Sequence, residues 1–318
     1  MLSMSIPLAE RLRPRTLDEY IGQAHLVGQN GVFRKFLETG NVPSFILWGP
    51  PGVGKTTLAK IVATTLKRPF YTLSAVTSGV KEVREVLESA RKQKFFDSKP
   101  PILFIDEIHR FNKSQQDSLL GAVEQGVFTL IGATTRAGQL SAPLRDRFGV
   151  TLRLELYTPQ ELSKIVTRSA SILNVDIDPT GALEIARRSR GTPRIANRML
   201  RRVRDFADVR ADGVITKEVA DEALRALEID DLGLDPIDHR MMHAIIENYG
   251  GGPVGIETLA ATIGEEAVTL LDVYEPYLMQ LGFLQRTPRG RCVTRKAYEH
   301  LGLSVPKSMD EVPEQLSL

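Results

Sequence analysis

The chain has 318 residues, which is long enough for two or three domains rather than one. Its 42% hydrophobic and 25% charged residues are ordinary for a soluble protein, and no apolar run could span a bilayer. The net charge of +2 does not by itself indicate binding to nucleic acid. The single cysteine, Cys292, excludes an intramolecular disulfide and a thiolate cluster for zinc, and residues 1–14 lack the apolar core of a secretory signal, so a cytoplasmic protein is expected.

The folded part is expected to begin near residue 8, with a segment whose backbone conformation is restricted by Pro14. Arg13 precedes Pro14, and proline disfavours helix in the residue before it, so the backbone there is expected to be extended or turning. Thr16 with Glu19 three residues later is a capping-box pattern. This pattern predicts the start of a short helix.

A glycine-rich turn lies between a predicted strand and a predicted helix. The strand is the apolar run Phe45–Trp48, and the helix shows apolar residues at helical spacing through Leu66. The turn reads Gly-Pro-Pro-Gly-Val-Gly-Lys-Thr over residues 49–56, which is the full pattern of a phosphate-binding loop in the context it requires. Backbone N–H groups and the helix N-terminus would hold a triphosphate, with Lys55 at the β- and γ-phosphates and the Thr56 hydroxyl on Mg²⁺. The sequence predicts binding of ATP or ADP with Mg²⁺, through Gly49, Pro50, Gly52, Val53, Gly54, Lys55, Thr56 and Thr57.

Two acidic residues follow the next buried strand. After a short strand at Phe70–Leu73 and a helix from Lys81 to about Gln93, the apolar run Ile102–Asp106 is typical of a fully buried parallel strand. Its carboxyl end is expected beside the phosphate loop, because α/β sheets bind ligands at that edge. We expect Asp106 to hold Mg²⁺ and Glu107 to orient and deprotonate the attacking water.

A further strand, Phe128–Thr135, ends in polar residues, and an arginine-containing turn follows it. Arg147 has two interpretations. It could form a surface salt bridge, or it could reach the ATP site of a neighbouring subunit as an arginine finger. The second interpretation implies a ring or partial ring of subunits.

A small helical bundle is predicted after about residue 157. Thr158 and Glu161 form a second capping box with Pro159 at the first helical position, and this helix runs to about Leu173. Further helices are expected to start at Asp178-Pro179 and after Gly191, which would place Arg194 at a helix start facing the nucleotide, with Tyr157 and Pro193 also in contact. Eight arginines between residues 187 and 204 fall on several faces, so they do not indicate a DNA site.

A third unit begins at Asp235-Pro236. Helices are expected to about residue 249, over 256–263 and over 269–281, followed by a hairpin around Pro288-Arg289-Gly290, which together describe a winged helix. Arg286, Arg289 and Arg291 are predicted to project from the wing towards DNA phosphates or a groove, although a basic solubilising turn is the alternative. The tail after Leu303 is expected to be disordered.

These motifs resemble known families. Residues 8–23 resemble the segment of AAA+ ATPases that lines the adenine pocket, which implies contacts from Leu12, Arg13, Tyr20 and Ile21. Residues 133–303 resemble the RuvB family of Holliday-junction branch-migration motors, in the stretches 144–149, 186–194, 251–255, 273–277 and 282–291. Residues 8–135 resemble instead the RarA (MgsA) replication-fork ATPases, in Ser74–Lys81 and Asp106–Gln116, so the chain is interpreted as a hybrid of the two families joined near Gly132–Thr135.

The resemblance implies an α/β fold: a P-loop AAA+ parallel-sheet domain at 1–156, a helical lid at 157–233, a winged-helix domain at 234–304 and a tail at 305–318. It implies an ATP-dependent DNA motor that hydrolyses Mg·ATP between subunits of a hexameric ring, with Thr135 at the γ-phosphate or the lytic water. The alternatives are a RarA-like fork ATPase and a scaffold that binds nucleotide without DNA work. RuvB proteins dock RuvA through a β-hairpin insert before the Ala-Thr-Thr strand. Residues 124–127 leave no room for it, so a RuvA-type partner is in doubt.

Overall fold

The computed structural model describes residues 7–94, 99–210 and 212–306. The chain divides into two compact units, one up to Ala223 and one from Leu224 onward. Among the described residues, no helix is both long enough and apolar enough to cross a membrane. The predicted disordered tail falls almost wholly on residues 307–318, which lie outside the described part of the chain.

A parallel sheet forms the centre of the first unit. Its strands are β1 (Phe45–Trp48), β2 (Phe70–Ser74), β3 (Ile102–Asp106), β4 (Thr129–Thr134) and β5 (Val150–Arg153), in the order β2-β3-β4-β1-β5. All of β4 and nearly all of β3 are buried, as their apolar runs predict for a sheet covered on both faces. The order places β4 between β1, which precedes the phosphate loop, and β3, which ends in the two acids. The predicted α/β fold class is confirmed.

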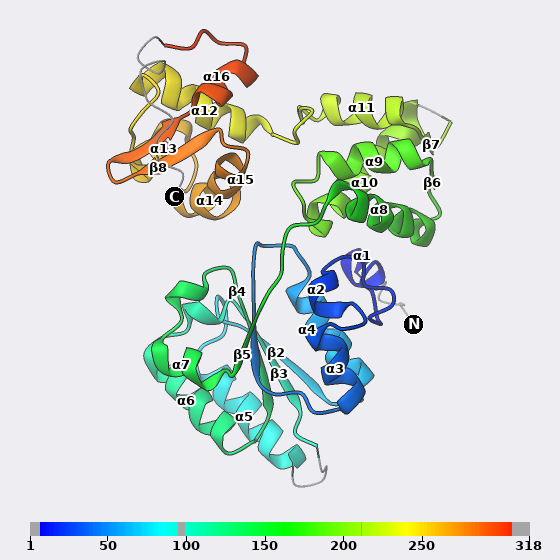
Figure 1. Ribbon diagram of the computed structural model, residues 1–318, viewed down its shortest axis with the longest axis vertical. Helices are drawn as coiled ribbons and strands as arrows, with labels where there is room; N and C mark the ends of the chain where they lie inside the picture. The colour runs from blue at the N-terminus through cyan, green and yellow to red at the C-terminus, as the bar shows by residue number, and fades with distance from the viewer. Residues whose placement is uncertain (1–6, 95–98, 211, 307–318) are drawn as a thin grey trace. The chain divides into compact units, whose positions relative to one another are not determined.

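Helices cover both faces of this sheet, as Figure 1 shows. On one face lie α3 (Val32–Thr39) and α4 (Lys55–Thr65), where the ring of Phe33 meets that of Phe45 edge-on at 5.4 Å. On the other face α5 (Val80–Lys94), α6 (Lys113–Glu124) and α7 (Ala142–Arg147) pack into one apolar core with β1, β3 and β4. The short helices α1 (Leu8–Arg11) and α2 (Ala24–Val27) precede α3, and the 3₁₀ turns Ile108–Arg110 and Ala137–Gln139 follow β3 and β4.

The helix predicted after Thr16 is absent, since residues 12–22 contain no helix. One of the two capping-box contacts forms, since Glu19 N–H donates to Thr16 Oγ1 over 3.3 Å, but Glu19 Oε2 accepts from the N–H of Arg15, one residue before the expected cap, over 2.9 Å. The same Oε2 atom also accepts from Arg168, on a helix of the lid, over 2.9 Å. The contact with Arg168 therefore helps to hold this segment as a turn rather than as the start of a helix.

The lid part of the first unit contains α8 (Pro159–Leu173), α9 (Pro179–Arg187) and α10 (Pro193–Arg210), with a two-strand pair β6 (Asp176–Ile177) and β7 (Val214–Ile215). α11 (Lys217–Ala226) runs across the division between the units. Both predicted caps form: Thr158 Oγ1 accepts from Glu161 N–H over 3.2 Å, and Asp178 Oδ1 accepts from Gly181 N–H over 2.6 Å.

The second unit has the winged-helix elements expected from the sequence. They are α12 (Pro236–Tyr249), α13 (Ile256–Ile263), α14 (Ala267–Thr269), α15 (Glu275–Gln280), the antiparallel hairpin of β8 (Leu284–Thr287) and β9 (Gly290–Val293), and α16 (Arg295–His300). The predicted helix over 269–281 is interrupted by a π-helical turn at Leu270–Tyr274. Pro276 explains this, because its missing N–H and its ring prevent a regular α-helical bond in that turn.

A candidate nucleotide site

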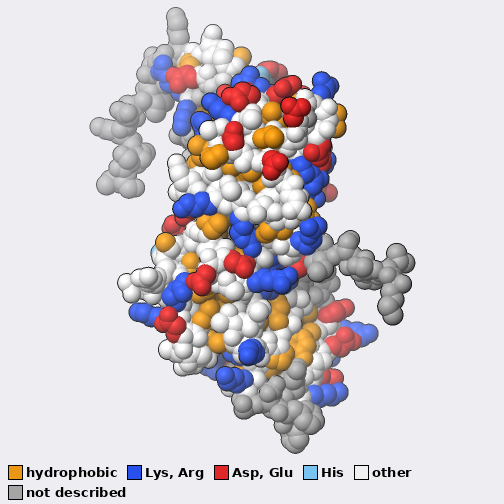
Figure 2. Space-filling model, turned by 90° about the vertical axis from the view of Figure 1, so that its right-hand side faces the viewer, with side chains coloured by type: hydrophobic (Ala, Val, Ile, Leu, Met, Phe, Trp, Pro, Cys, Tyr) orange, Lys and Arg blue, Asp and Glu red, His pale blue; other side chains and the backbone are white. Residues whose placement is uncertain are grey.

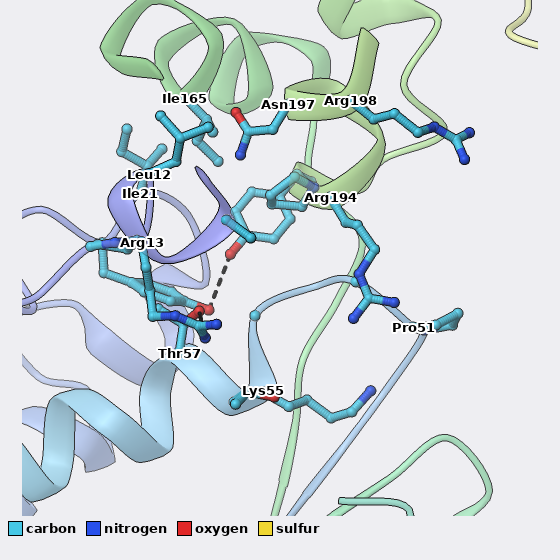
Figure 3. Close-up of a pocket in the computed structure, with 18 of the residues that line it drawn as sticks. Leu12, Arg13, Ile21, Pro51, Lys55, Thr57, Ile165, Arg194, Asn197 and Arg198 are labelled. Atoms are coloured by element: carbon cyan, nitrogen blue, oxygen red, sulfur yellow. Dashed lines mark hydrogen bonds between the residues drawn. The ribbon is translucent and has the colours of Figure 1, made fainter. Parts of the chain in front are cut away.

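A cavity of about 580 Å³ lies at the carboxyl edge of the sheet, between the phosphate loop, the segment from residue 8 to residue 21 and the lid helices. Most of the predicted nucleotide contacts line it: Leu12, Arg13, Tyr20, Ile21, Gly52, Gly54, Lys55, Thr56, Thr57, Asp106, Glu107, Tyr157, Pro193 and Arg194. Figure 3 shows Leu12, Ile21 and Ile165 together at one end and the side chains of Lys55 and Arg194 towards the other. The cavity thus has an apolar end and a charged end.

The phosphate loop needs glycine where the chain turns into α4. Gly52 and Gly54 have φ of +80° and +105°, in the left-handed region that glycine adopts without strain. A Cβ on Gly54 would lie only 2.6 Å from the hydroxyl of Tyr20. The glycine therefore permits both the turn and the close approach of the tyrosine.

Lys55 is buried and turned back onto its own loop. Its Nζ donates hydrogen bonds to the carbonyl oxygens of Gly49 and Pro50, both over 2.8 Å. Burial lowers the pKa of Lys55 to about 8, although the nearby charges of Glu107 and Asp106 oppose that shift. Gly49 and Pro50 are not among the residues that line the cavity; they hold the lysine instead.

A pair of tyrosines joins three parts of the site. The Tyr157 hydroxyl lies 3.1 Å from the Tyr20 hydroxyl and 3.2 Å from the Val53 carbonyl oxygen, and the Tyr20 hydroxyl lies 3.4 Å from that same oxygen. Burial raises the pKa of Tyr157 to about 12 and that of Tyr20 well above its usual range, so both phenols stay neutral. Val53, whose side chain is buried, acts through its carbonyl and does not line the cavity.

The two acids after β3 lie at the charged end of the cavity. Asp106 Oδ1 accepts from Glu107 N–H over 3.2 Å, and burial, followed by the charge of Glu107, raises the pKa of Asp106. Glu107 has φ of +52°, an uncommon conformation for a residue with a Cβ. Its Oε2 accepts from Thr135 Oγ1 over 3.1 Å and lies 3.3 Å from Nδ1 of His109. The backbone conformation and these two contacts fix where the carboxylate points.

Sequence reasoning missed His109 and several lid residues. His109 is almost fully buried and also lies 2.8 Å from Thr134 Oγ1, a contact that its place two residues after the acids could have suggested. Asn197, Arg198 and Arg201 line the cavity at helical spacing from Arg194, so the spacing was a usable signal. The remaining missed lining residues are Leu8, Ala9, Pro14, Glu19, Pro51, Ile165 and Arg168.

Ion pairs and hydrogen bonds hold the apolar end of the cavity in place. Arg13 donates to Thr57 Oγ1 over 3.2 Å and to Glu10 over 3.0 Å, and Glu10 also pairs with Lys60 of α4 at 2.8 Å. From the lid, Arg168 donates to the carbonyl oxygen of Leu12 over 2.9 Å. These contacts tie the segment near residue 12 to both α4 and α8.

Two predicted catalytic residues lie outside the cavity lining. Thr135 contacts Glu107 but is not itself among the lining residues. Arg147, at the end of α7, is 46% exposed, and its Nη1 lies 3.9 Å from Glu124 Oε1. At that distance the ion pair is weak, which leaves the guanidinium available at the surface.

One of the three predicted DNA contacts is wrong. Arg286 is 61% exposed and Arg289 is exposed at the hairpin turn, but Arg291 is buried. Its Nε donates to Oε2 of Glu275 over 2.8 Å, and the Glu275 side chain is also buried. Arg291 does not project from the wing, because its guanidinium neutralises a buried carboxylate.

Comparisons with known proteins give the same domain order. The model of the RuvB AAA lid domain matches residues 157–230, that of the RuvB C-terminal winged helix domain matches 231–302, and that of the AAA family (ATPase family associated with various cellular activities) matches 45–156. The solved RuvB Holliday junction branch migration motor of Thermotoga maritima is 46% identical over 93% of this chain and 100% of its own, with a TM-score of 0.84. The chain belongs to the RuvB family. A proline-to-glycine variant of the same RuvB protein is 45% identical over 92% of this chain and 100% of its own, with a TM-score of 0.83.

Membership in the RuvB family makes the chain an AAA ATPase. The solved RuvB structure matches 93% of this chain, which includes residues of both compact units. The interpretation of residues 8–135 as a RarA-derived part gains no support from these comparisons.

Proposed function

We propose that this RuvB-family chain is an ATP-driven motor that moves the branch point of Holliday-junction DNA. The observation that carries the proposal is one cavity lined by the phosphate loop, the acids at the end of β3 and an arginine of the lid. This arrangement would couple the nucleotide to movement of the lid, since Arg194 lies at the start of a lid helix and lines the same cavity as Lys55. The Thermotoga maritima relative is described as a branch migration motor.

The cavity fits a nucleoside triphosphate in size and chemistry. An adenine would occupy the apolar end near Leu12 and Ile21, and the phosphates would lie along the N-terminus of α4. The Lys55 ammonium, which here donates to the carbonyl oxygens of Gly49 and Pro50, would exchange them for phosphate oxygens. Thr56 and Asp106 would hold a magnesium ion, which neutralises phosphate charge when bound.

Hydrolysis would use the carboxylate of Glu107 to orient a water and accept its proton. Thr135 would hold that carboxylate and approach the γ-phosphate side. Arg147 would complete the site of an adjacent subunit, which requires a ring, and we propose a hexamer. We assign the nucleotide-binding domain to residues 1–156, the lid to 157–233 and the DNA-binding domain to 234–304, with Arg286 and Arg289 facing phosphates.

This chain would not dock a RuvA-type partner in the way that the RuvB resemblance implies, through a β-hairpin insert. α6 ends at Glu124 and β4 begins at Thr129, so the connection has no room for a docking hairpin. We infer that this chain does not engage RuvA through such an insert. The cytoplasmic location and the RarA-like origin of residues 8–135 stay predictions.

The test is the ATPase rate of the purified chain without DNA, with a four-way junction and with a gapped duplex, alongside its mass in ATP. Greater stimulation by the junction than by the gapped duplex would support the proposal. Greater stimulation by the gapped duplex would favour a RarA-like fork ATPase, the family that residues 74–81 and 106–116 resemble. Nucleotide binding with no stimulation of the ATPase rate by either DNA would overturn the motor proposal and favour a nucleotide-binding scaffold.

A further inference from the structure

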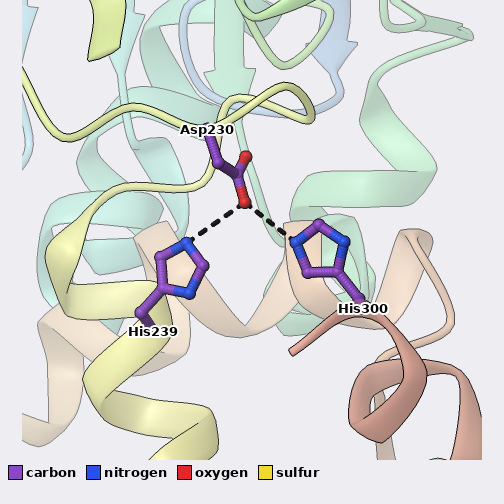
Figure 4. Close-up of side chains that lie close together, drawn as sticks. All are labelled: Asp230, His239 and His300. Carbon is purple, nitrogen blue, oxygen red and sulfur yellow. Dashed lines mark hydrogen bonds and ion pairs between the residues drawn. The ribbon is translucent and has the colours of Figure 1, made fainter. Parts of the chain in front are cut away.

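A cluster of one carboxylate and two imidazole side chains lies wholly within the second unit. Asp230 precedes α12, His239 is on α12 and His300 ends α16, so three separate segments meet at one point. Oδ2 of Asp230 lies 3.1 Å from Nε2 of His239 and 2.9 Å from Nε2 of His300. Figure 4 shows both imidazoles turned towards that single oxygen.

The backbone fixes the carboxylate in this position. Oδ1 of Asp230 accepts from the N–H groups of Leu232 and Leu234 over 2.9 and 2.8 Å. The main chain of Asp230 also bonds to the carbonyl of Leu234 and the N–H of Gly233, over 3.0 and 2.9 Å. With Oδ1 engaged in the loop, Oδ2 is the atom presented to the histidines.

Packing orients the two rings. They stack on each other with centroids 6.2 Å apart, and the ring of Phe283 stacks on His300 at 4.9 Å. The three side chains are only partly covered, with exposed fractions of 23% for Asp230 and His300 and 31% for His239. An ion and one water could therefore reach the cluster from solvent.

We propose that Asp230, His239 and His300 bind a divalent transition-metal ion, with zinc preferred. Two imidazole nitrogens and one carboxylate oxygen form a donor set that suits zinc, and the three atoms already lie within 4.8 Å of one another. Ligand atoms of a tetrahedral zinc site are about 3.3 Å apart, so small shifts would admit the ion, with a water as fourth ligand. A bound ion would clamp the segment that leads into the winged helix onto its first and last helices.

The experiment is a zinc titration of the full-length chain, without an affinity tag, nucleotide-free and stripped with a chelator, followed by calorimetry. Millimolar Mg²⁺ is present to occupy the phosphate-loop site. We expect one equivalent of zinc to bind and to raise the calorimetric unfolding midpoint. His239→Gln and His300→Gln should each weaken binding by more than about tenfold, because even removing a group that supports a metal ligand costs that much.

His243→Gln is the matched control, since His243 lies one turn further along α12 and pairs with Glu247. Cys292→Ser is the second control, because Cys292 is the one thiol in the sequence. Both controls should bind zinc like the parent chain. The cobalt complex of the parent chain should show the visible absorption of tetrahedral nitrogen and oxygen ligands without a thiolate band. Absence of zinc binding to the parent chain, or unchanged affinity in both cluster variants, would overturn the proposal even if one variant folded poorly.

Discussion

The hydroxyl of Thr135 donates a hydrogen bond to Oε2 of Glu107 over 3.1 Å. This contact joins the polar ends of β3 and β4, which are adjacent parallel strands. His109 approaches the same oxygen at 3.3 Å and binds Thr134 at 2.8 Å. The carboxylate is thus held by residues from two strands before any substrate is present, a form of pre-organisation that favours proton transfer at a fixed place.

Glu107→Gln should bind ATP normally and hydrolyse it at least about 100-fold more slowly, because an amide cannot accept the proton of the attacking water. Phosphate release under saturating ATP measures the rate, and calorimetric titration measures the affinity. Thr135→Ser, which keeps the hydroxyl that contacts Glu107, should retain most of the activity. Phosphate release by the glutamine variant at the parent rate would remove the role assigned to Glu107.

Lys55→Ala should lower ATP affinity by about 100-fold, because it removes charge-assisted hydrogen bonds to two phosphates. Titration calorimetry with Mg·ATP gives the affinity directly. Lys35→Ala, at an exposed position of α3, is the matched control and should bind like the parent chain. Equal affinities in the two variants would show that the phosphates do not lie at the N-terminus of α4.

Local signals in the sequence predicted much of this architecture. The caps at Thr158 and Asp178 were predictable because donor and acceptor lie three residues apart. The phosphate loop and the acidic strand end were predictable because each is a continuous motif whose strand context fixes its place. Those features define the charged half of the nucleotide cavity.

Contacts between distant segments were not predictable. Tyr20 and Tyr157 were both predicted to contact the nucleotide, but nothing near either residue indicates that their hydroxyls bond to each other across 137 positions of sequence. Arg291 was misplaced for the same reason. It faces Arg286 across the hairpin, and its ion pair with Glu275, sixteen positions earlier on α15, makes its burial favourable.

Arg147→Ala should retain ATP binding and lose most hydrolysis, if the arginine completes a neighbour's site. The decisive measurement mixes it with Lys55→Ala. About one interface in four of a randomly mixed ring would then join an intact phosphate loop to an intact Arg147, and activity should reappear. Arg145→Ala, two residues earlier on α7 and also exposed, is the control. Mixtures that stay as inactive as their components would argue against catalysis across subunits.

Arg286→Ala and Arg289→Ala should each weaken DNA binding across sequences. Each should also reduce the slope of log affinity against log salt by about one, because each removes one phosphate contact. Fluorescence anisotropy with a four-way junction at several salt concentrations measures both effects. Arg295→Ala, an exposed arginine on α16 that pairs with Glu299, should leave the slope unchanged. If the slope of log affinity against log salt were unaltered in both hairpin variants, the basic turn would have only a solubilising role.

Arg291→Ala should destabilise the second unit by about 3 kcal/mol, because the buried Glu275 carboxylate loses its partner at 2.8 Å and keeps the exposed Arg286 at 3.9 Å. For a unit of this size the calorimetric midpoint should fall by about 12 °C or more. Replacing both partners, Glu275→Leu with Arg291→Met, should restore much of that loss, since no buried charge remains. An Arg291→Ala variant with an unchanged midpoint but a reduced salt slope for DNA would mean instead that this guanidinium reaches phosphate rather than Glu275.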